Sequence, residues 1–275
     1  MSDGSNRTMF LRVPVTRVGR PGGRDDSAAV EEPLEVRLHG KPFAVIMRTP
    51  GDDRALAAGF LLSEGVISTT DDLGAVEHCH HPRHPEVHNV VDVYLLGEAA
   101  TGLAEHLATR RQVLTSSSCG MCGRVSIDSL SQRAPRVDRA WQMDRGVAGS
   151  LPLRLREHQG TFEQTGGLHA AALFTPDGQC ERAAEDVGRH NAVDKVIGSM
   201  LLDDRLPLSG FALVVSGRTS FEILQKAWIA GIGLVCAVSA PSTLAIDVAN
   251  DAGITLLGFA RDGGFNIYAH PERIV

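Results

Sequence analysis

Hydrophobic and polar residues alternate over residues 34–38, and a second apolar run covers residues 43–47. The polar turn between the two runs makes a β-hairpin the expected structure. From residue 52 to residue 64 the apolar positions recur at helical spacing and a glycine follows, which predicts a helix. Two further elements are expected in this half of the chain, a strand at 90–96 and a helix at 102–110.

The second half of the chain alternates continuous apolar runs with amphipathic segments. Strands are expected at 169–174, 180–185, 211–215, 233–238, 255–259 and 265–268, and helices at 189–202, 220–230 and 243–252. Such alternation is typical of a largely parallel sheet that is covered by helices on both faces. Ligands of these sheets bind beyond the carboxyl ends of the strands, so a site is expected in the loops that follow the strands.

Composition limits the class of protein. Of the 275 residues, 43% are hydrophobic and 22% are charged, which is ordinary for a soluble globular protein. The net charge of -6 argues against a general nucleic-acid or anionic-membrane binder, and no run approaches the roughly 18 apolar residues of a membrane-spanning helix. The five cysteines are odd in number and scattered, which suits a reducing compartment, and the N-terminus lacks the apolar core of a signal peptide. We therefore expect a cytoplasmic protein that binds neither nucleic acid nor membrane.

The chain is expected to have a tail and two folded parts. Residues 1–28 are polar and rich in glycine, arginine and aspartate, which predicts a disordered N-terminal tail. An N-terminal subdomain is expected at 29–140 and a second subdomain at 141–275. The predicted fold class is therefore α/β, with an α+β N-terminal part.

The most informative motif is Cys119-Gly-Met-Cys122, in the first of these parts. Hydroxyl residues precede it and glycines flank it, so a loop is expected, and residues 124–131 have the spacing of a short helix. The cysteines would then lie just before a helix N-terminus, whose exposed N–H groups and dipole favour an anion such as a thiolate. Arg124 adds a cation beside them. Cys119 and Cys122 are therefore predicted to be chemically reactive.

Other uses of the paired cysteines stay open. Zinc deaminases combine His-x-Glu with Pro-Cys-x-x-Cys, but here two alanines follow His169 and a serine precedes Cys119. A structural zinc site needs a second ligand pair at short spacing, which the three histidines and the cysteine at 78–81 could supply. That segment is more typical of a solvated surface loop, so we expect no bound metal, and the zinc content of purified protein distinguishes the cases. A thioredoxin-like pair is disfavoured because the motif does not follow the first strand of a βαβ unit.

The remaining motifs are polar segments that follow the ends of expected strands. They are Ser216-Gly217-Arg218, the segment 239–243 that begins with Ser239, and Arg261-Asp262-Gly263-Gly264. Each opens a helix or a tight turn with free N–H groups, so together they can hold an anionic, phosphate-bearing ligand. A denser cluster occupies 185–195, where three carboxylates, a guanidinium, an imidazole and an ammonium meet at the start of a helix. We expect it to serve binding or catalysis, although a solvated helix start also favours acidic residues.

Taken together, these motifs resemble the formate dehydrogenase accessory protein family, the FdhD-type sulfurtransferases. The matching segments are, in order, Cys119-Gly-Met-Cys122-Gly, Gly166-Gly-Leu-His169, Glu185-Asp-Val-Gly-Arg-His-Asn-Ala-Val-Asp-Lys195, Ser216-Gly-Arg218 and Gly258-Phe-Ala-Arg261. The likeness runs from about residue 31 to residue 274, and its segment at 185–191 is highly specific. It implies a cytidine-deaminase-like mixed sheet with helices on both faces, a smaller β-rich N-terminal part, and a homodimer.

The resemblance also implies a function. The protein would take sulfur from a cysteine desulfurase as a persulfide on Cys119 and pass it to the molybdenum cofactor of the formate dehydrogenase catalytic subunit. Cys122 could resolve the persulfide, assist the transfer or tune Cys119. The implied cofactor is molybdenum bis(molybdopterin guanine dinucleotide), and a guanine nucleotide such as GDP would be a partial mimic of it. The expected contact residues are Phe259, Ala260, Arg261, Asp262, Gly263 and Gly264, joined by Ser216, Gly217, Arg218, Ser239, His169, Asp186, Arg189 and His190.

Overall fold

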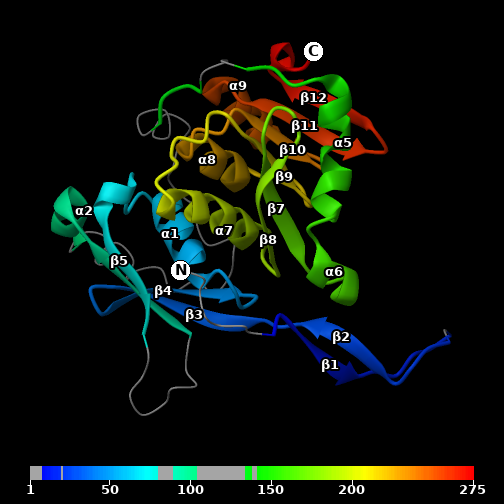
Figure 1. The fold of residues 1–275 in the computed structure, drawn as a ribbon, viewed down its shortest axis with the longest axis horizontal. Coiled ribbons are helices and arrows are strands. Elements are labelled where there is room, and N and C mark those ends of the chain that lie inside the picture. Colours follow the sequence, from blue (N-terminus) through cyan, green and yellow to red (C-terminus); the bar gives the residue numbers. More distant parts are fainter. Residues whose placement is uncertain (1–7, 20, 80–88, 104–133, 138–140) are drawn as a thin grey trace.

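The computed structural model describes residues 8–19, 21–79, 89–103, 134–137 and 141–275, which form a mixed α/β fold (Figure 1). The strands in these ranges are grouped in a six-stranded sheet, a four-stranded sheet and a two-stranded ribbon. These ranges also contain two short 3₁₀ helices, η1 (Thr70–Asp72) in the first half of the chain and η2 (Pro271–Arg273) after the last strand. The predicted α/β class is confirmed. None of the described helices combines the length and the hydrophobicity that crossing a bilayer requires.

The six-stranded sheet is built by the second half of the chain. Its strands, in spatial order, are β12 (Gly264–Ala269), β11 (Thr255–Arg261), β10 (Leu234–Ala237), β9 (Ala212–Val215), β7 (His169–Phe174) and β8 (Cys180–Asp186). The pairs β9–β10 and β10–β11 are parallel, whereas β7–β9, β7–β8 and β11–β12 are antiparallel. The expectation of a largely parallel sheet is therefore wrong. Tight turns at 175–179 and 262–263 return the chain antiparallel to itself on both sides of the parallel strands.

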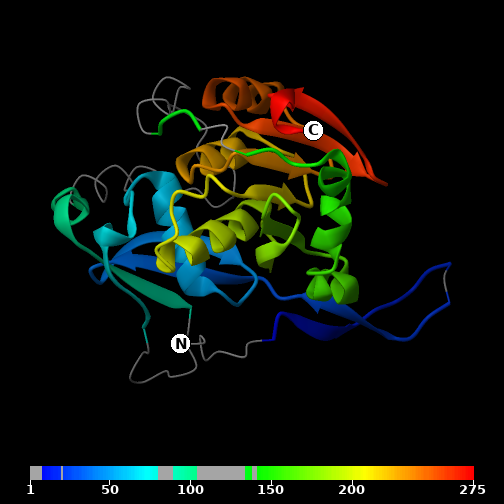
Figure 2. The same cartoon turned by 45° about the horizontal axis from the view of Figure 1, so that its top comes forward.

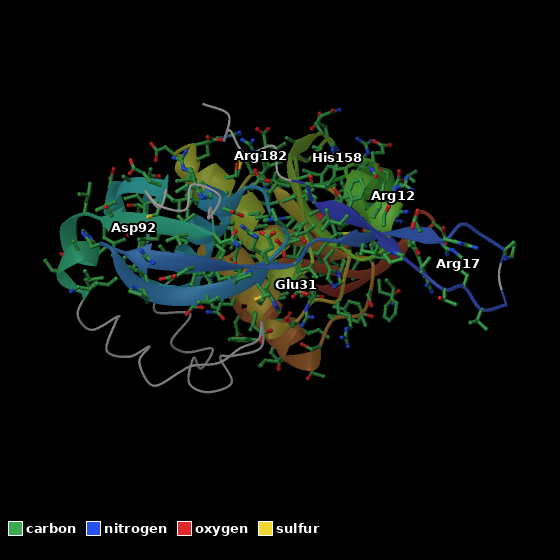
Figure 3. All side chains as sticks on the ribbon, turned by 90° about the horizontal axis from the view of Figure 1, so that it is seen from below. Arg12, Arg17, Glu31, Asp92, His158 and Arg182 are labelled. Carbon is green, nitrogen blue, oxygen red and sulfur yellow. The ribbon has the colours of Figure 1, made fainter. Side chains whose placement is uncertain are left out.

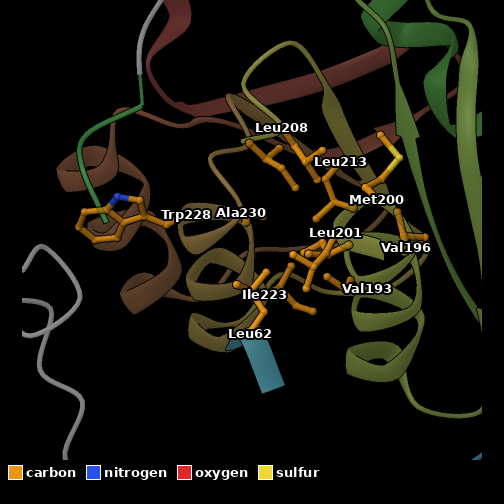
Figure 4. Packing of buried hydrophobic residues seen from close by; sticks show 14 of the residues in the cluster. Leu62, Val193, Val196, Met200, Leu201, Leu208, Leu213, Ile223, Trp228 and Ala230 are labelled. Atoms are coloured by element: carbon orange, nitrogen blue, oxygen red, sulfur yellow. The ribbon is translucent and has the colours of Figure 1, made fainter. Parts of the chain in front are cut away.

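Helices cover both faces of this sheet, as expected. They are α5 (Arg145–Arg156), α6 (Gly160–Thr165), α7 (Arg189–Leu202), α8 (Phe221–Ile229) and α9 (Thr243–Ala252). On one face, α7, α8 and α9 share a large buried cluster with the sheet, and Figure 4 shows Val193, Leu201 and Ile223 gathered between α7 and α8. On the other face, α5 packs through Leu151 and Leu155 (Figure 1). The sheet is thus buried on both sides.

The four-stranded sheet belongs to the first half of the chain. Its strands, in spatial order, are β4 (Lys41–Arg48), β3 (Glu32–Leu38), β6 (Val90–Leu95) and β5 (Leu73–His78). β3 and β4 form the predicted hairpin, and the alternating Leu34, Val36 and Leu38 are fully buried in the cluster that includes α1 (Asp53–Glu64). A short helix, α2 (Gly97–Thr101), follows β6. Most of the helix expected at 102–110 lies outside the described residues.

α1 crosses α7 at very short range and joins the two halves of the chain. A Cβ atom added to Gly59 would lie 2.0 Å from the carbonyl oxygen of Asp194, and one added to Gly198 would lie 1.9 Å from the carbonyl oxygen of Ala55. Because the opposing atoms are backbone, a larger residue cannot be accommodated without moving a helix. The buried cluster takes residues from both sides of position 140, so the expected boundary there does not separate two cores.

The described part of residues 1–28 is not the disordered tail that its composition predicted. β1 (Phe10–Pro14) pairs antiparallel with β2 (Asp25–Ala29) over five residues. The resulting ribbon projects from the rest of the chain in both views of the cartoon, and Figure 3 shows Arg17 near its outer end. Arg17 lies 3.3 Å from the carboxylate of Asp26 in the opposite strand. The prediction from composition failed because strand pairing is made by backbone hydrogen bonds and needs few apolar side chains.

Candidate functional site

Three of the predicted loops meet at the carboxyl ends of β9, β10 and β11. Ser216 exchanges two hydrogen bonds with Ala170 of β7, because its N–H donates to the Ala170 carbonyl at 3.0 Å and its hydroxyl accepts from the Ala170 N–H at 2.9 Å. A parallel bridge at Thr219 links this first loop to the second. Close to the third loop, the N–H of Phe259 in β11 donates to the carbonyl of Ser239 in the second loop at 3.2 Å. The loops therefore line the edge of the sheet at which the parallel strands β9, β10 and β11 end. This is the edge that the order of strands in the sequence predicted.

His169, Gly217 and Arg189 lie together on this edge. A Cβ atom on Gly217 would lie 3.4 Å from Nδ1 of His169 and 3.9 Å from Cδ of Arg189. Because Gly217 has no side chain, the space between the His169 ring and the aliphatic part of the Arg189 side chain stays open. Burial lowers the pKa of His169 and the Arg189 charge lowers it further, against the opposing effect of Asp186. His169 is therefore neutral at physiological pH, with a cation beside it.

His190 lies on the first turn of α7 and faces α8. The residue is 7% exposed, and its Nε2 lies 3.9 Å from a carboxylate oxygen of Glu222 on the first turn of α8. Burial lowers the pKa of His190 to about 4, and the charges of Lys226 and Arg189 act in the same direction. The ring is thus uncharged at neutral pH, so it can donate or accept a hydrogen bond without adding charge.

Acid should destabilise the protein through His190. Its pKa is about 4 in the folded chain, whereas an unfolded histidine titrates near 6.5. As the pH falls between these two pKa values, the unfolded state binds a proton that the folded state does not. The free energy of unfolding should therefore fall by about 3 kcal/mol. Urea denaturation at a series of pH values measures this, and His190→Gln should lose less stability than the wild type. Equal losses in the two proteins would contradict a buried, neutral ring.

The start of α8 contributes Thr219, Ser220 and Glu222, which sequence reasoning missed. Ser220 is the N-cap residue of α8, and Thr219 is 1% exposed. Partial burial raises the pKa of Glu222, but the Ser220 hydroxyl and the residue's own N–H outweigh burial and the pKa is lowered. The available signal was a Thr-Ser pair at the end of a strand, just before an amphipathic helix with an acidic first turn.

Asp186 supports the loop before α7 from inside the protein. It is fully buried, and one carboxylate oxygen accepts hydrogen bonds from the Gly188 N–H at 2.8 Å and the Asn191 amide at 2.9 Å. The other oxygen lies 2.8 Å from Nζ of Lys195 and accepts from the Thr49 N–H at 3.2 Å. These four donors occupy the carboxylate, which therefore supports the loop before α7; a ligand contact by Asp186 stays a prediction.

Thr49, which sequence reasoning also missed, ties the first half of the chain to this loop with all of its polar groups. Its N–H donates to Asp186, its hydroxyl accepts from the Val187 N–H at 3.1 Å, and its carbonyl accepts from Nζ of Lys195 at 2.9 Å. The partners are 137 to 146 residues away in sequence, so no local pattern marks Thr49. The loop that precedes Arg189 and His190 is therefore held by both halves of the chain.

The hairpin between β11 and β12 carries the expected contact segment 259–264. Its exposed members are Phe259, Arg261, Asp262, Gly263 and Gly264. Phe259 is 42% exposed and has a positive φ of 52°, as does Asp262 with 53°. Ala260 is fully buried in the cluster that includes α5, so it can offer a ligand only its backbone. A Cβ atom on Gly149 of α5 would lie 2.4 Å from the Gly263 carbonyl oxygen, so α5 packs directly on the turn.

The predicted reactive pair, Cys119 and Cys122, lies outside the described residues. The described thiols are poor nucleophiles. Burial raises the pKa of Cys236 to about 12, and it also raises the pKa of Cys180 and of Cys79. A raised pKa lowers the thiolate fraction at neutral pH, so these thiols are expected to be unreactive.

The segment that could supply zinc ligands lies only partly within the described residues. Among the described residues, which include His78 and Cys79, no group of three His, Cys, Asp or Glu side chains could hold a metal ion. The histidines at 80 and 81 and the helix expected at 124–131 lie outside the described part of the chain.

Comparison with known proteins identifies the family. The FdhD/NarQ family model matches residues 29–275. The chain belongs to this family. Members similar to it include the Sulfur carrier protein FdhD of Streptomyces avermitilis, 48% identical over 98% of this chain and 95% of that protein. The protein of the same name from Sulfurisphaera tokodaii is 45% identical over 91% of this chain and 92% of its own.

A solved structure supports the same assignment. A crystal structure from Desulfotalea psychrophila, described as a formate dehydrogenase accessory protein, matches with a TM-score of 0.73 and 25% identity, over 97% of this chain and 98% of that one. The family resemblance and the mixed α/β fold expected from the motifs are therefore confirmed. In this FdhD/NarQ chain, the described part of the candidate site is the carboxyl edge of the six-stranded sheet.

Proposed function

We propose that this chain is a sulfur carrier for the maturation of a formate dehydrogenase. The observation that carries the proposal is the FdhD/NarQ match over residues 29–275, with similar proteins named Sulfur carrier protein FdhD at 45% and 48% identity. The solved relative described as a formate dehydrogenase accessory protein points to the client enzyme. In this proposal Cys119 carries the sulfur as a persulfide.

The chemistry proposed for Cys119 is a thiolate exchange. Its thiolate attacks the outer sulfur of a persulfide on a cysteine desulfurase, a new S–S bond forms, and the donor cysteine leaves as a thiolate. Delivery is the same exchange in the other direction: a nucleophilic acceptor takes the outer sulfur and Cys119 leaves as a thiolate. Sulfur moves as a neutral atom in both steps, so the carrier thiol is regenerated without a reductant. Cys122 is left with three candidate roles, resolving the persulfide, assisting the transfer or tuning Cys119.

The acceptor that we propose is molybdenum bis(molybdopterin guanine dinucleotide), held as cargo before it reaches the formate dehydrogenase catalytic subunit. Its pyrophosphate groups suit an edge whose loops and helix starts carry the three arginines Arg189, Arg218 and Arg261. Nε of Arg189 is buried and has no hydrogen-bond partner in the described part of the chain, as expected for a group that meets a ligand. When bound, the cofactor supplies the metal centre that receives sulfur.

We also propose a compartment, an oligomeric state and a sulfur donor for the carrier. The carrier works in the cytoplasm, as a homodimer, with a cysteine desulfurase as its donor. Free thiols at Cys79, Cys180 and Cys236 are consistent with a reducing compartment. Light scattering of the purified protein tests the dimer.

Sulfur loading at Cys119 tests the proposed function. After incubation with a cysteine desulfurase and cysteine, intact mass spectrometry should show that the wild type gains the mass of a sulfur atom, which a reductant removes. Cys119→Ala should gain none, because the attacking thiolate is gone. Cys180→Ala and Cys236→Ala are matched controls and should load like the wild type, since burial keeps both thiols protonated.

Two results would contradict this mechanism. Unchanged loading in a Cys119→Ala/Cys122→Ala double variant would exclude both thiols, and loading lost in Cys122→Ala alone would move the carrier to Cys122. In cells that lack the endogenous protein, Cys119→Ala should also leave formate dehydrogenase inactive while the Cys180→Ala control restores it.

A further inference from the structure

The β1–β2 ribbon is ordered without a hydrophobic core of its own. Residues 11–14 of β1 are all exposed, so both faces of this strand meet solvent. Leu11 is 57% exposed and Val18 is 88% exposed, although both side chains are large and apolar. At the base of the ribbon, the Val30 N–H donates to the Met9 carbonyl at 2.8 Å. Because a two-stranded ribbon alone is marginally stable in water, its outer part is expected to pack on another surface.

The four-stranded sheet presents such a surface on the side that does not pack on α1. This side, the open face, is made of residues that lie opposite one another on neighbouring strands, namely the pairs Pro33–Met47, Glu35–Val45, Ala75–Tyr94 and Glu77–Asp92. Val45 is 64% exposed, Met47 48% and Tyr94 43%. The ribbon and the open face together hold six of the twelve large hydrophobic side chains that are exposed in the described part of the chain. Exposed apolar side chains that gather in this way mark a contact surface.

The ribbon and the open face carry opposite charges. Residues 8–24 contain four arginines and no acidic residue, a charge of +4, whereas the whole chain carries -6, so the rest of the chain carries -10. The open face has three carboxylates and one guanidinium, those of Glu35, Glu77, Asp92 and Arg37. The charge of Asp92 raises the pKa of Tyr94 on the same face. Opposite charges of this kind favour contact between the two surfaces.

The ribbon does not lie on the open face of its own chain. In both views of the cartoon it projects away from the four-stranded sheet. Figure 3 shows Arg17 near the outer end of the ribbon and Asp92 on the opposite side of the view. A contact between ribbon and open face therefore joins two chains, and the reciprocal contact closes a dimer with two-fold symmetry.

We propose that the β1–β2 ribbon of one copy of this chain docks on the open face of a second copy. Leu11 and Val18 of the ribbon meet the apolar part of the open face around Val45 and Met47, and the ribbon arginines meet its carboxylates. The inference rests on the proposed homodimer and goes beyond it, because it names the two surfaces that meet and makes the order of the ribbon depend on the partner.

Sedimentation equilibrium of single variants tests the two surfaces. Leu11→Glu on the ribbon and Val45→Glu on the open face should each raise the dissociation constant of the dimer by about tenfold or more, because each variant puts a charge into an apolar contact. Leu153→Glu is the matched control. Leu153 of α5 is 71% exposed and belongs to neither surface, so this variant should dimerise like the wild type. All three side chains are exposed, so the fold of each chain should tolerate the changes.

Mixing the two variants tests whether the ribbon meets the open face. A dimer of Leu11→Glu with Val45→Glu concentrates both defects in one of its two contacts and leaves the other contact with wild-type residues on both sides. Either variant alone has a defect in both contacts. The mixture should therefore form several-fold more dimer than the separate variants at the same total concentration. A mixture that dimerises no better than its components would overturn the proposed pairing.

Hydrogen exchange tests whether the partner orders the ribbon. The Val15 N–H, which donates to the Arg24 carbonyl at 2.7 Å, should exchange slowly in the dimer and faster after dilution to monomer. Val45→Glu should speed this exchange as well, although Val45 lies in the other sheet, because the ribbon loses its partner's open face. The same protection in Val45→Glu as in the wild type, or a lower melting temperature of the monomer in this variant, would show that the chain's own residues hold the ribbon or cover the face.

The outcomes separate this inference from the carrier function. A wild-type monomer would overturn the inference and the proposed homodimer together, and a dimer that both single variants leave intact would overturn the inference alone. Sulfur loading at Cys119 is measured on the same preparations. A dimer weakened by both variants in a protein that loads no sulfur would support the docking of the ribbon and overturn only the carrier function.

Discussion

Lys195→Met is expected to lower the free energy of unfolding by about 3–5 kcal/mol. The Nζ atom of Lys195 lies 2.8 Å from the carboxylate of Asp186, and the two side chains are 1% and 0% exposed. Without the ammonium group, Asp186 keeps a buried negative charge with only neutral donors around it. Urea denaturation at neutral pH measures the change.

Arg205→Met is the matched control for this substitution. Arg205 pairs with Glu181, but the two side chains are 41% and 31% exposed, so losing the pair should change stability by less than about 1 kcal/mol. Similar losses for the two methionine variants would show that burial of the Lys195–Asp186 pair has no special energetic weight.

A second large effect is expected for Gly198→Ala, which should destabilise the protein by about 3 kcal/mol or more. The added Cβ would lie 1.9 Å from the carbonyl oxygen of Ala55 and 2.5 Å from the backbone nitrogen of Gly59. These are backbone atoms of α1, so the helix itself must move. Melting temperature and urea midpoint should both fall.

Gly210→Ala provides the control for the glycine variant. A Cβ there meets no atom within 4 Å, so stability should change by no more than about 0.5 kcal/mol. If Gly198→Ala were as stable as this control, α1 and α7 would not be in backbone contact in solution.

Hydrophobic periodicity was sufficient to locate most elements of the second half. The helices predicted at 189–202 and 243–252 have those bounds in the structure. Their ends are encoded locally, as in α9, where Ser242 caps the N-terminus and Gly253 adopts a left-handed conformation at the C-terminus. Signals of this kind need no knowledge of distant residues.

α5 shows where such signals fail. The segment Arg145–Arg156 contains Gly146, Gly149 and Pro152, which are all poor helix formers, so no helix was expected. Its N-cap Asp144 accepts hydrogen bonds from the first turn, but the close packing of Gly149 on the β11–β12 turn is a contact between distant segments. Only the tertiary structure explains why glycine is needed there.

The candidate site was predictable as a region but not residue by residue. Asp186 and Arg189 are three positions apart, yet the Asp186 carboxylate has four protein donors, whereas Nε of Arg189 has no hydrogen-bond partner among the described residues. The difference depends on Thr49, which is 137 residues away from Asp186. Sequence reasoning therefore marked the charged cluster at 185–195 as a whole and could not separate the side chains that protein donors saturate from those that they do not.

The crossing of α1 and α7 has a consequence for synthesis on the ribosome. Ser63 of α1 donates a hydrogen bond to Asp194 of α7, which is translated 131 residues later. At about 5–20 residues per second, the nascent chain waits roughly 7 to 26 s for this partner. During that interval the face of α1 that carries Gly59 is not covered by α7 and is available to chaperones, and a chain that stops before α7 exposes it permanently. Folding of the first half is thus coupled to the translation of α7.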